Sequence, residues 1–231
     1  SGGGTTNSQG INIGNGTINI NGNLTGGAGT SSFGLQGSTT NITVANSTIS
    51  GGNAQGINGT NCSCTITNST INSQGLNING GSSVFNITAT VSANTNFTAI
   101  TINAGTVTIT GNVSNPGGAT GAINISAGTV TINGSITGTT SYGINITNGS
   151  LTVNGNVNAG TAGTAAGINF QGGSVIVNGN IFGGGGNLSN GNGINIALAT
   201  ITSLLINGNV TGGTNSAGIY NQFAGTNIIV S

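Results

Sequence analysis

A short unit of alternating residues recurs along almost the whole chain and constrains its fold more than any other feature. Residues 143–166 carry it most clearly, as three runs at 144–146, 151–153 and 156–158 in which aliphatic residues alternate with asparagine or threonine. Successive side chains of a strand point to opposite faces, so the aliphatic residues of each run share one face. Glycine and an Asn-Gly pair separate the runs and favour turns. The unit predicts three short strands joined by two tight corners, with an apolar face that one unit cannot bury alone.

Equivalent units follow one another at a mean spacing of about 23 residues, which lies within the range of solenoid repeats. The spacing varies mainly after the third run, where loops of unequal length suit a coil of stacked rungs. The sequence therefore predicts an all-β fold, a right-handed parallel β-helix (β-solenoid) of about ten rungs with three short strands per rung. The rungs open at Gly10, Gly34, Gly56, Gly75, Ala99, Ala122, Gly143, Gly167, Gly193 and Gly218.

We expect one β-solenoid domain at residues 10–231, preceded at residues 1–9 by a segment rich in Gly, Ser, Thr and Asn that lacks the alternation. At a strand spacing of about 4.8 Å, ten rungs form a rod roughly 45–50 Å long. Ile, Val and Leu should form columns inside, and Asn and Thr should form columns outside. Stacked Asn amides at the Asn-Gly corners are expected to form hydrogen-bonded ladders. These corner residues are Asn21, Asn133, Asn154, Asn178 and Asn207.

The chain contains no Lys, Arg, Asp, Glu or His, whereas about a quarter of the residues of a typical protein are charged. Neutralising phosphates requires Lys or Arg, so we expect no nucleic-acid partner and no polybasic attachment to lipid. No apolar run is long enough for a membrane helix, so we expect no membrane insertion. Acid–base and nucleophilic catalysis need carboxylates, His or Lys, so we predict neither an enzyme nor a bound cofactor.

The two cysteines, Cys62 and Cys64, are predicted to point inward. Aligning residues 65–71 with residues 43–49 places Cys64 at the inward position of Ile42, and Cys62 lies two residues earlier. We interpret both as small buried hydrophobic residues. A strained disulfide is the alternative, since residues i and i+2 of an extended strand lie near the upper Cα distance for bridging. Two thiols without His or a carboxylate cannot complete a tetrahedral shell, so no metal site is expected.

The predicted coil shows no amphipathic helix or charged cap, with which solenoids cover the sheet edges at their ends. Uncapped ends favour end-to-end pairing with another copy, and we expect the polar N-terminal segment to help complete the unfinished last rung of a neighbour. The alternative is that the chain is a fragment of a longer passenger whose caps lie elsewhere. The residues assigned to this assembly surface are Ser1, Gly2, Gly3, Gly4, Asn227, Ile228, Ile229 and Val230.

The outward face of the second run carries pairs of threonines in several rungs. Two Thr per rung on a flat sheet resemble the regular arrays of ice-binding solenoids, although Ile176 interrupts the pattern. The alternative interpretation is that β-favouring threonines occupy a solvent-exposed or packing face. The candidate threonine face comprises Thr106, Thr108, Thr129, Thr131, Thr152, Thr200 and Thr202.

Asn-x-Ser/Thr triplets are frequent and would accept glycans in a chain secreted by a glycosylating source. A chain rich in Asn, Ser and Thr also produces such triplets by chance. Many of them fall at ladder positions, where a glycan would crowd the next rung. The candidate acceptors are Asn15, Asn23, Asn41, Asn46, Asn58 and Asn68.

The pattern GINI…GTVTI…NGNV resembles the β-helical passengers of autotransporter and filamentous-haemagglutinin-type surface proteins. The resemblance covers almost the whole chain as an architecture and includes no diagnostic motif. It implies an extracellular protein of the cell surface. Those proteins normally carry some charged residues, and the absence of charge here points away from an adhesin and toward assembly.

The sequence therefore favours a structural subunit of an extracellular filament or surface layer, in which uncapped solenoids stack end to end with copies of themselves. A charge-free surface does not repel its own copies, and little titrates or is screened near neutral pH. The alternatives are an adhesin or passenger stalk, with a host surface or glycans as partner, and an ice-binding protein that uses the threonine face.

Overall fold

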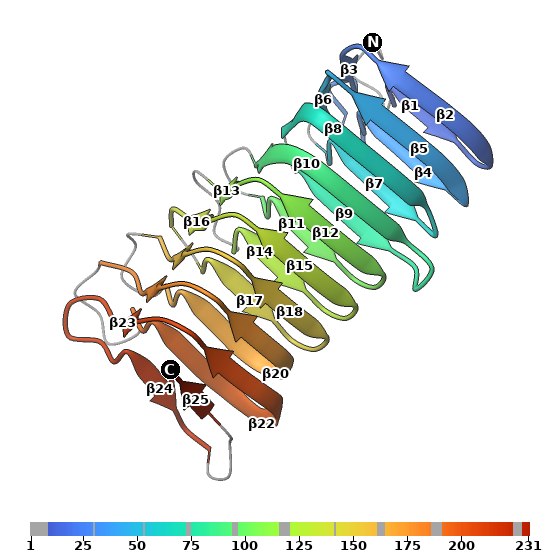
Figure 1. Cartoon of the computed structure of the whole chain (residues 1–231). Helices are drawn as coiled ribbons and strands as arrows, with labels where there is room; N and C mark the ends of the chain where they lie inside the picture. Colours follow the sequence, from blue (N-terminus) through green and yellow to red (C-terminus); the bar gives the residue numbers. More distant parts are fainter. Residues whose placement is uncertain are drawn as a thin grey trace.

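The computed structural model shows one coil of short parallel strands stacked into a rod, with β1 (Ile11–Ile13) and β25 (Ile228–Val230) at opposite ends (Figure 1). Strand is the only regular secondary structure among the described residues, so the predicted all-β solenoid is confirmed. The described residues are 9–29, 31–52, 54–72, 75–93, 97–115, 121–140, 142–160, 165–185, 191–223 and 228–231.

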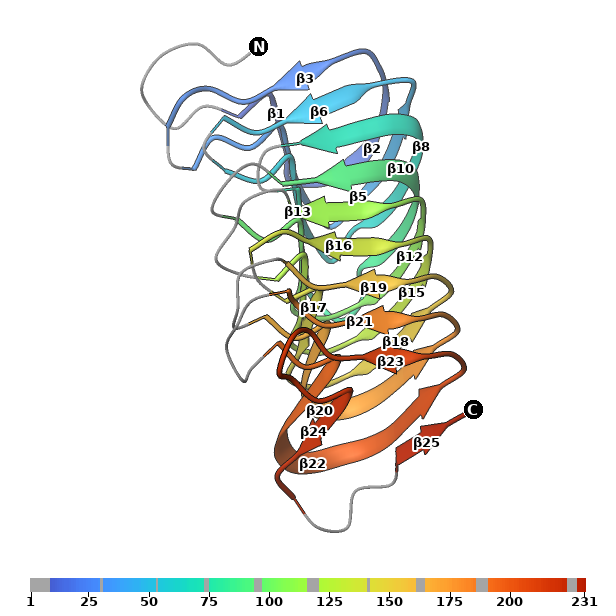
Figure 2. The same cartoon turned by 90° about the vertical axis from the view of Figure 1, so that its left-hand side faces the viewer.

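Each full turn of the coil contributes a strand to each of three columns, which we number in the order in which the chain passes through them. Within a column every strand pairs in parallel with its equivalent in the next turn (Figure 2). The first column contains β1, β4 (Leu35–Ser38), β7 (Ile57–Thr60), β9 (Leu76–Asn79), β11 (Ile100–Ile102), β14 (Ile123–Ile125), β17 (Ile144–Ile146), the first parts of β20 (Ile168–Val177) and β22 (Ile194–Ile206), and β24 (Ile219–Asn221).

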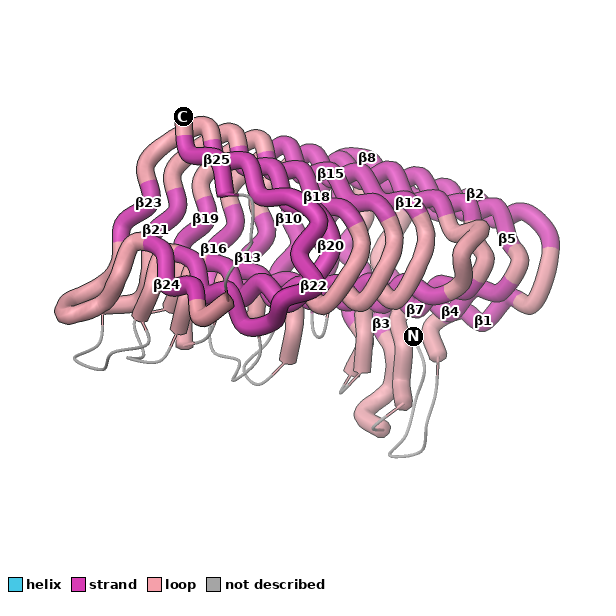
Figure 3. Tube along the Cα trace, turned by 90° about the horizontal axis from the view of Figure 1, so that it is seen from below, coloured by secondary structure: helices cyan, strands magenta, loops and turns pink. Residues whose placement is uncertain are grey.

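The second and third columns follow after one corner each, and four long strands bend through a corner without interruption. The view from below shows the strands of successive turns in rows along the rod (Figure 3). The second column contains β2 (Gly16–Asn21), β5 (Thr40–Ala45), the first parts of β8 (Ser63–Asn72) and β10 (Val84–Ser92), β12 (Thr106–Thr110), β15 (Thr129–Asn133), β18 (Ser150–Val153), the second parts of β20 and β22, and β25. The third column contains β3 (Leu24–Thr25), β6 (Thr48–Ser50), the second parts of β8 and β10, β13 (Val113–Asn115), β16 (Ile136–Gly138), β19 (Val157–Asn158), β21 (Ile181–Phe182) and β23 (Val210–Thr211).

About eight turns of the coil are stacked between neighbours on both sides, fewer than the ten rungs predicted. The difference lies at the ends. The first turn, made of β1, β2 and β3, pairs with a neighbour on one side only, and the last is represented by β24 and β25 alone. The right-handed sense of the coil stays a prediction.

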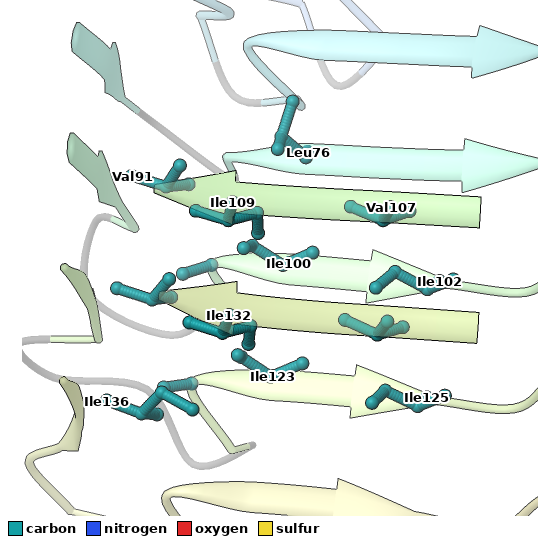
Figure 4. Close-up of a cluster of buried hydrophobic side chains, with 14 of the residues drawn as sticks. Leu76, Val91, Ile100, Ile102, Val107, Ile109, Ile123, Ile125, Ile132 and Ile136 are labelled. Atoms are coloured by element: carbon teal, nitrogen blue, oxygen red, sulfur yellow. The ribbon is translucent and has the colours of Figure 1, made fainter. Parts of the chain in front are cut away.

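The interior consists of columns of aliphatic side chains, as the alternation predicts. Ile109, Ile132, Val153, Val177 and Ile206 occupy one such column, aligned by the strand register and each fully buried. Figure 4 shows Ile109 and Ile132 at equivalent places in successive turns. Burying one such side chain contributes about 1.5–3 kcal/mol, so the stacked interior supplies the main stabilisation of the fold.

Two turns depart from the aliphatic pattern, with glycine at an inward position of the first column. Gly37 and Gly59 hold the inward position of the first column that Ile78 holds in the next turn. A Cβ atom on Gly59 would lie 2.4 Å from the ring of Phe85, which is fully buried. Glycine at position 59 thus leaves space for a large side chain of the second column.

The corner between the first and second columns requires a residue in the left-handed backbone region. L side chains pay about 1–2 kcal/mol there, so glycine recurs at this point of the turn. Its φ angle is 104° at Gly105, 100° at Gly128, 97° at Gly149 and 87° at Gly173.

A ladder of asparagine side chains runs along the corner between the second and third columns, as predicted. Asn154 donates from Nδ2 to Oδ1 of Asn133, Asn178 donates to Asn154, and Asn207 donates to Asn178, each at 2.7 Å. Asn21 does not join this ladder, because its register partner in the next turn is Ala45.

A second ladder lies on the outward face of the first column. The Nδ2 atoms of Asn145, Asn169 and Asn195 donate to the Oδ1 atoms of Asn124, Asn145 and Asn169, at 2.9, 2.8 and 3.0 Å. These ladders repeat the parallel register in the side chains and disfavour a slip of one turn against the next.

We expect Gly128→Ala to lower the free energy of unfolding by at least about 1–2 kcal/mol. Gly128 has φ of 100°, and a Cβ atom there would lie 2.4 Å from the carbonyl oxygen of Gly105. Gly14→Ala is the matched control, since a Cβ atom there meets nothing within 4 Å. Denaturant unfolding compares the two variants, and equal midpoints would contradict the strain assigned to the corner.

Candidate functional site: the threonine face and the ends of the coil

The outward face of the second column brings most of the predicted threonines together. Thr106 pairs with Thr129 and is exposed like it, and Thr108 pairs with Thr131. Thr152 continues the line from Thr131 in the next turn. Thr108, Thr131 and Thr152 are half-buried, because each lies between the side chains of the neighbouring turns. The array is thus regular over three turns.

The structure does not place Thr200 and Thr202 in this array. Strand β22 has 13 residues, and its register against β20 shifts twice. Thr200 lies opposite Gly172, and the residues aligned with the array are Ser203 and Leu205. Thr202 is exposed within this irregular part of β22.

The threonine line becomes apolar toward the C-terminal end. Ile176, Leu205 and Ile229 follow Thr152 in register, and we call these three residues the apolar stack. They line a groove of about 430 Å³ together with Thr202, Ser203, Leu204 and Ile228. In the sequence Ile176 interrupts the threonine pattern, but the repeat pattern did not predict that Leu205 and Ile229 continue from it as an apolar stack. The signal was present in the consecutive aliphatic residues Leu204–Leu205 and Ile228–Val230, which place apolar side chains on both faces of a strand.

The inner aliphatic columns reach both ends of the coil with half-buried side chains. The partly buried hydrophobic residues that pack against the core come from the end strands or, for Phe223, lie two residues after one. They are Ile11, Ile18, Ile20 and Leu24 at the N-terminal end, and Val210, Ile219, Phe223 and Ile228 at the C-terminal end.

The residues predicted for assembly divide into three groups. Ser1, Gly2, Gly3, Gly4 and Asn227 lie outside the described residues. Ile228 is half-buried and Val230 is 49% exposed, and both extend inner columns, since they pair with Leu204 and Ile206. Ile229, 58% exposed, faces outward on the apolar stack.

Five of the six candidate glycan acceptors have exposed side chains, and one belongs to a ladder. Asn15, Asn23, Asn41, Asn46 and Asn68 are exposed. Asn46 and Asn68 hold left-handed corners, with φ of 50° and 48°.

The sixth acceptor, Asn58, is half-buried and its Oδ1 atom accepts from Nδ2 of Asn77 at 3.0 Å. The Oδ1 atom of Asn23 also has a partner, the backbone N–H of Thr48 at 2.9 Å. Whether any of the six carries a glycan stays a prediction.

Both cysteines are free, inward and fully buried, so the interpretation as small core residues is confirmed and the disulfide alternative is wrong. Cys64 lies opposite Ile42, as the alignment predicted. The Sγ atom of Cys62 donates to the carbonyl oxygen of Thr60 at 3.2 Å and lies 3.3 Å from Oγ1 of Thr40. Burial, and secondly the neighbouring Cys62, raise the pKa of the Cys64 thiol far above its usual range.

In the part of the chain that the structure describes, no three Cys, His, Asp or Glu side chains gather as metal ligands. The same residues include no helix with the length and apolarity of a membrane crossing. No protein-family model matches the chain, and no curated protein or solved structure matches it either. A functional proposal therefore rests on the threonine face, the apolar stack and the two ends.

The raised pKa of Cys64 predicts how stability depends on pH. In the unfolded chain the thiol ionises near its ordinary pKa of about 8.5, whereas in the folded chain it stays neutral. The contribution of the neutral Cys64 thiol to the free energy of unfolding is therefore fully present below about pH 8. It is lost as the pH rises above that value. Urea unfolding from acidic to mildly alkaline pH should show this decline in the wild type and a weaker one in Cys64→Ala. The same slope in both proteins would contradict the assignment.

Proposed function

We propose that the protein is a structural subunit of an extracellular filament or surface layer, assembled by end-to-end stacking of coils with copies of itself. The observation that carries the proposal is that the inner aliphatic columns reach both ends of the described coil only half-buried. A second copy stacked in the same direction would cover these side chains. It would also pair the outer edges of strands β1 and β2 with those of strands β24 and β25.

Most inner lines of the coil begin and end with an aliphatic residue. The column that begins at Ile11 ends at Ile219, and the column that begins at Leu24 ends at Val210. Stacking one copy on another so that Ile11 follows Ile219 would continue the first column with an aliphatic pair at the junction. In the third column Leu24 and Val210 would stay one turn apart, because the last turn is represented by β24 and β25 alone.

The second column offers two more such pairs and the first column one exception. The inner lines that begin at Ile18 and Ile20 end at Ile228 and Val230. The line that begins at Ile13 instead ends at Asn221, which is exposed. Four of the five inner lines therefore present aliphatic side chains at both ends.

The absence of charge supports assembly in a second way. With no Lys, Arg, Asp, Glu or His, copies meet without electrostatic repulsion, and salt screens no attractive ion pair. The architectural resemblance to autotransporter and haemagglutinin passengers supports an extracellular location and leaves an adhesin stalk as an alternative role, with a host surface or glycans as partner. The end-to-end match favours the filament.

A pair of end variants tests the stacking. Ile20→Asp and Val230→Lys each place a charge where the junction would bury it unpaired, a penalty of several kcal/mol. We expect the wild type to form filaments that persist across wide salt and mildly acidic to neutral pH ranges. Each variant alone should stay as short rods in negative-stain electron microscopy and in sedimentation.

Mixing the two variants in equal amounts should restore filaments, because the Asp end of one copy meets the Lys end of the other. Thr106→Asp, the same charge on the exposed flat face, is the matched control and should still assemble. A wild type that remains as single rods at high concentration would overturn the proposal. Assembly by Ile20→Asp alone would show that copies associate elsewhere.

A second candidate function is ice binding by the threonine face, favoured by the in-register pairs Thr106–Thr129 and Thr108–Thr131. If the array binds ice, the wild type at low concentration should depress the freezing point below the melting point. Thr129→Asn should reduce that gap, whereas Thr137→Asn, an exposed residue of β16 in the third column, should leave it unchanged. No gap in the wild type would remove this candidate.

A further inference from the structure

Among the asparagines that precede glycine, Asn148 is held differently from those of the ladders. It is exposed at the corner between β17 and β18, and its Oδ1 atom accepts the backbone N–H of the next residue, Gly149, at 2.8 Å. The neighbouring turns have Ala127–Gly128 and Gly172–Gly173 at this corner, so Asn148 has no asparagine above or below it with which to stack.

The asparagines of the corner ladder have their amides occupied. Asn154 donates from Nδ2 to Asn133 and accepts at Oδ1 from Asn178, both at 2.7 Å. These two bonds hold its amide along the axis of the rod, toward the adjacent turns rather than toward the backbone nitrogen of Gly155. Asn178 is held in the same way between Asn154 and Asn207.

We propose that Asn148 is a site of spontaneous deamidation, which converts it to aspartate or isoaspartate. The Gly149 nitrogen lies 2.8 Å from Oδ1, which is bonded to Cγ, the carbon that the nitrogen would attack, and glycine offers no side chain to obstruct its approach. A nucleophile and an electrophile that are held close together react faster than the same groups without that contact.

The reaction needs only water. The nitrogen of Gly149 loses its proton to water or hydroxide, and its electron pair forms a bond to Cγ. The Cγ–Nδ2 bond then breaks, and Nδ2 leaves as ammonia after taking up a proton. Water opens the resulting cyclic imide at one of its two C–N bonds. Breaking the bond to Cγ yields aspartate, and breaking the bond to the original backbone carbon yields isoaspartate.

The product introduces a charged side chain into a chain that otherwise has none. Each event places one carboxylate on a protein with no Asp, Glu, Lys, Arg or His. At neutral pH this carboxylate is ionised, so the modified protein carries one additional negative charge. Isoaspartate also adds a methylene group to the backbone at a corner whose following residue, Gly149, has φ of 97°.

The wild-type protein can be tested without any substitution. Purified protein is incubated at mildly alkaline pH, and tandem mass spectrometry after digestion with a protease of aliphatic and aromatic specificity follows each Asn-Gly pair. We expect conversion at Asn148 to be about tenfold faster than at Asn154. Equal rates, or faster conversion at Asn154, would overturn the proposal.

Two controls separate the geometry from the local sequence. In denaturant both sites are plain Asn-Gly pairs, and the ratio of their rates should fall to about one. A ratio that persists in denaturant would assign the difference to sequence and overturn the geometric argument. In the double variant Asn133→Ala/Asn178→Ala, which frees the amide of Asn154, conversion at Asn154 should rise toward that of Asn148.

Isoelectric focusing gives an independent readout. The aged wild type should accumulate a species with one additional negative charge, and Asn148→Gln should not, since its longer side chain does not form the five-membered imide. A charged species of equal amount in the variant would place the reaction elsewhere. These readouts report on each chain separately, so they apply whether or not copies assemble into filaments.

Discussion

Parallel pairing in register between successive turns is the constraint on which every other feature of this protein depends. It places inward residues of one turn directly over those of the next, which forms columns such as Ile109–Ile132–Val153. The same register aligns polar residues outside, where identical amides bond to one another along the ladders. The residue type at each position is therefore constrained by the residues at the equivalent positions of the turns above and below.

The alternation of aliphatic and polar residues was sufficient to predict the coil, its inner columns and the corner ladder, because each depends on local spacing that repeats. It was sufficient for Cys64 too, since the aligned segments have no insertion between them. It failed at Thr200 and Thr202, where β22 contains extra residues and two register shifts that no local pattern reveals. The need for glycine opposite Phe85 was likewise invisible, because these residues are 26 positions apart and meet only after folding.

The surface properties follow from what the repeat leaves out. Without charged side chains, interactions at this surface come from hydrogen-bonding amides and hydroxyls and from aliphatic groups, and the structure gives these a gradient along the rod. Threonine dominates the outward line of the second column in its middle, and Ile176, Leu205 and Ile229 replace it toward β25. The two ends differ as well, since one inner line begins at Ile13 and finishes at Asn221. The rod therefore has two different ends and a surface that changes along its axis, so a partner would bind it in one direction.

The backbone hydrogen bonds that join the turns run along the axis of the rod, and three columns carry them in parallel. Tension applied between the ends would load the three columns of an interface together, so separating two turns requires breaking their bonds almost at once rather than one after another. A force applied sideways to a single end strand such as β25, which pairs with β22 through three residues, would instead peel it away bond by bond. The coil should therefore resist force applied along its axis more strongly than sideways force applied to a strand at one end.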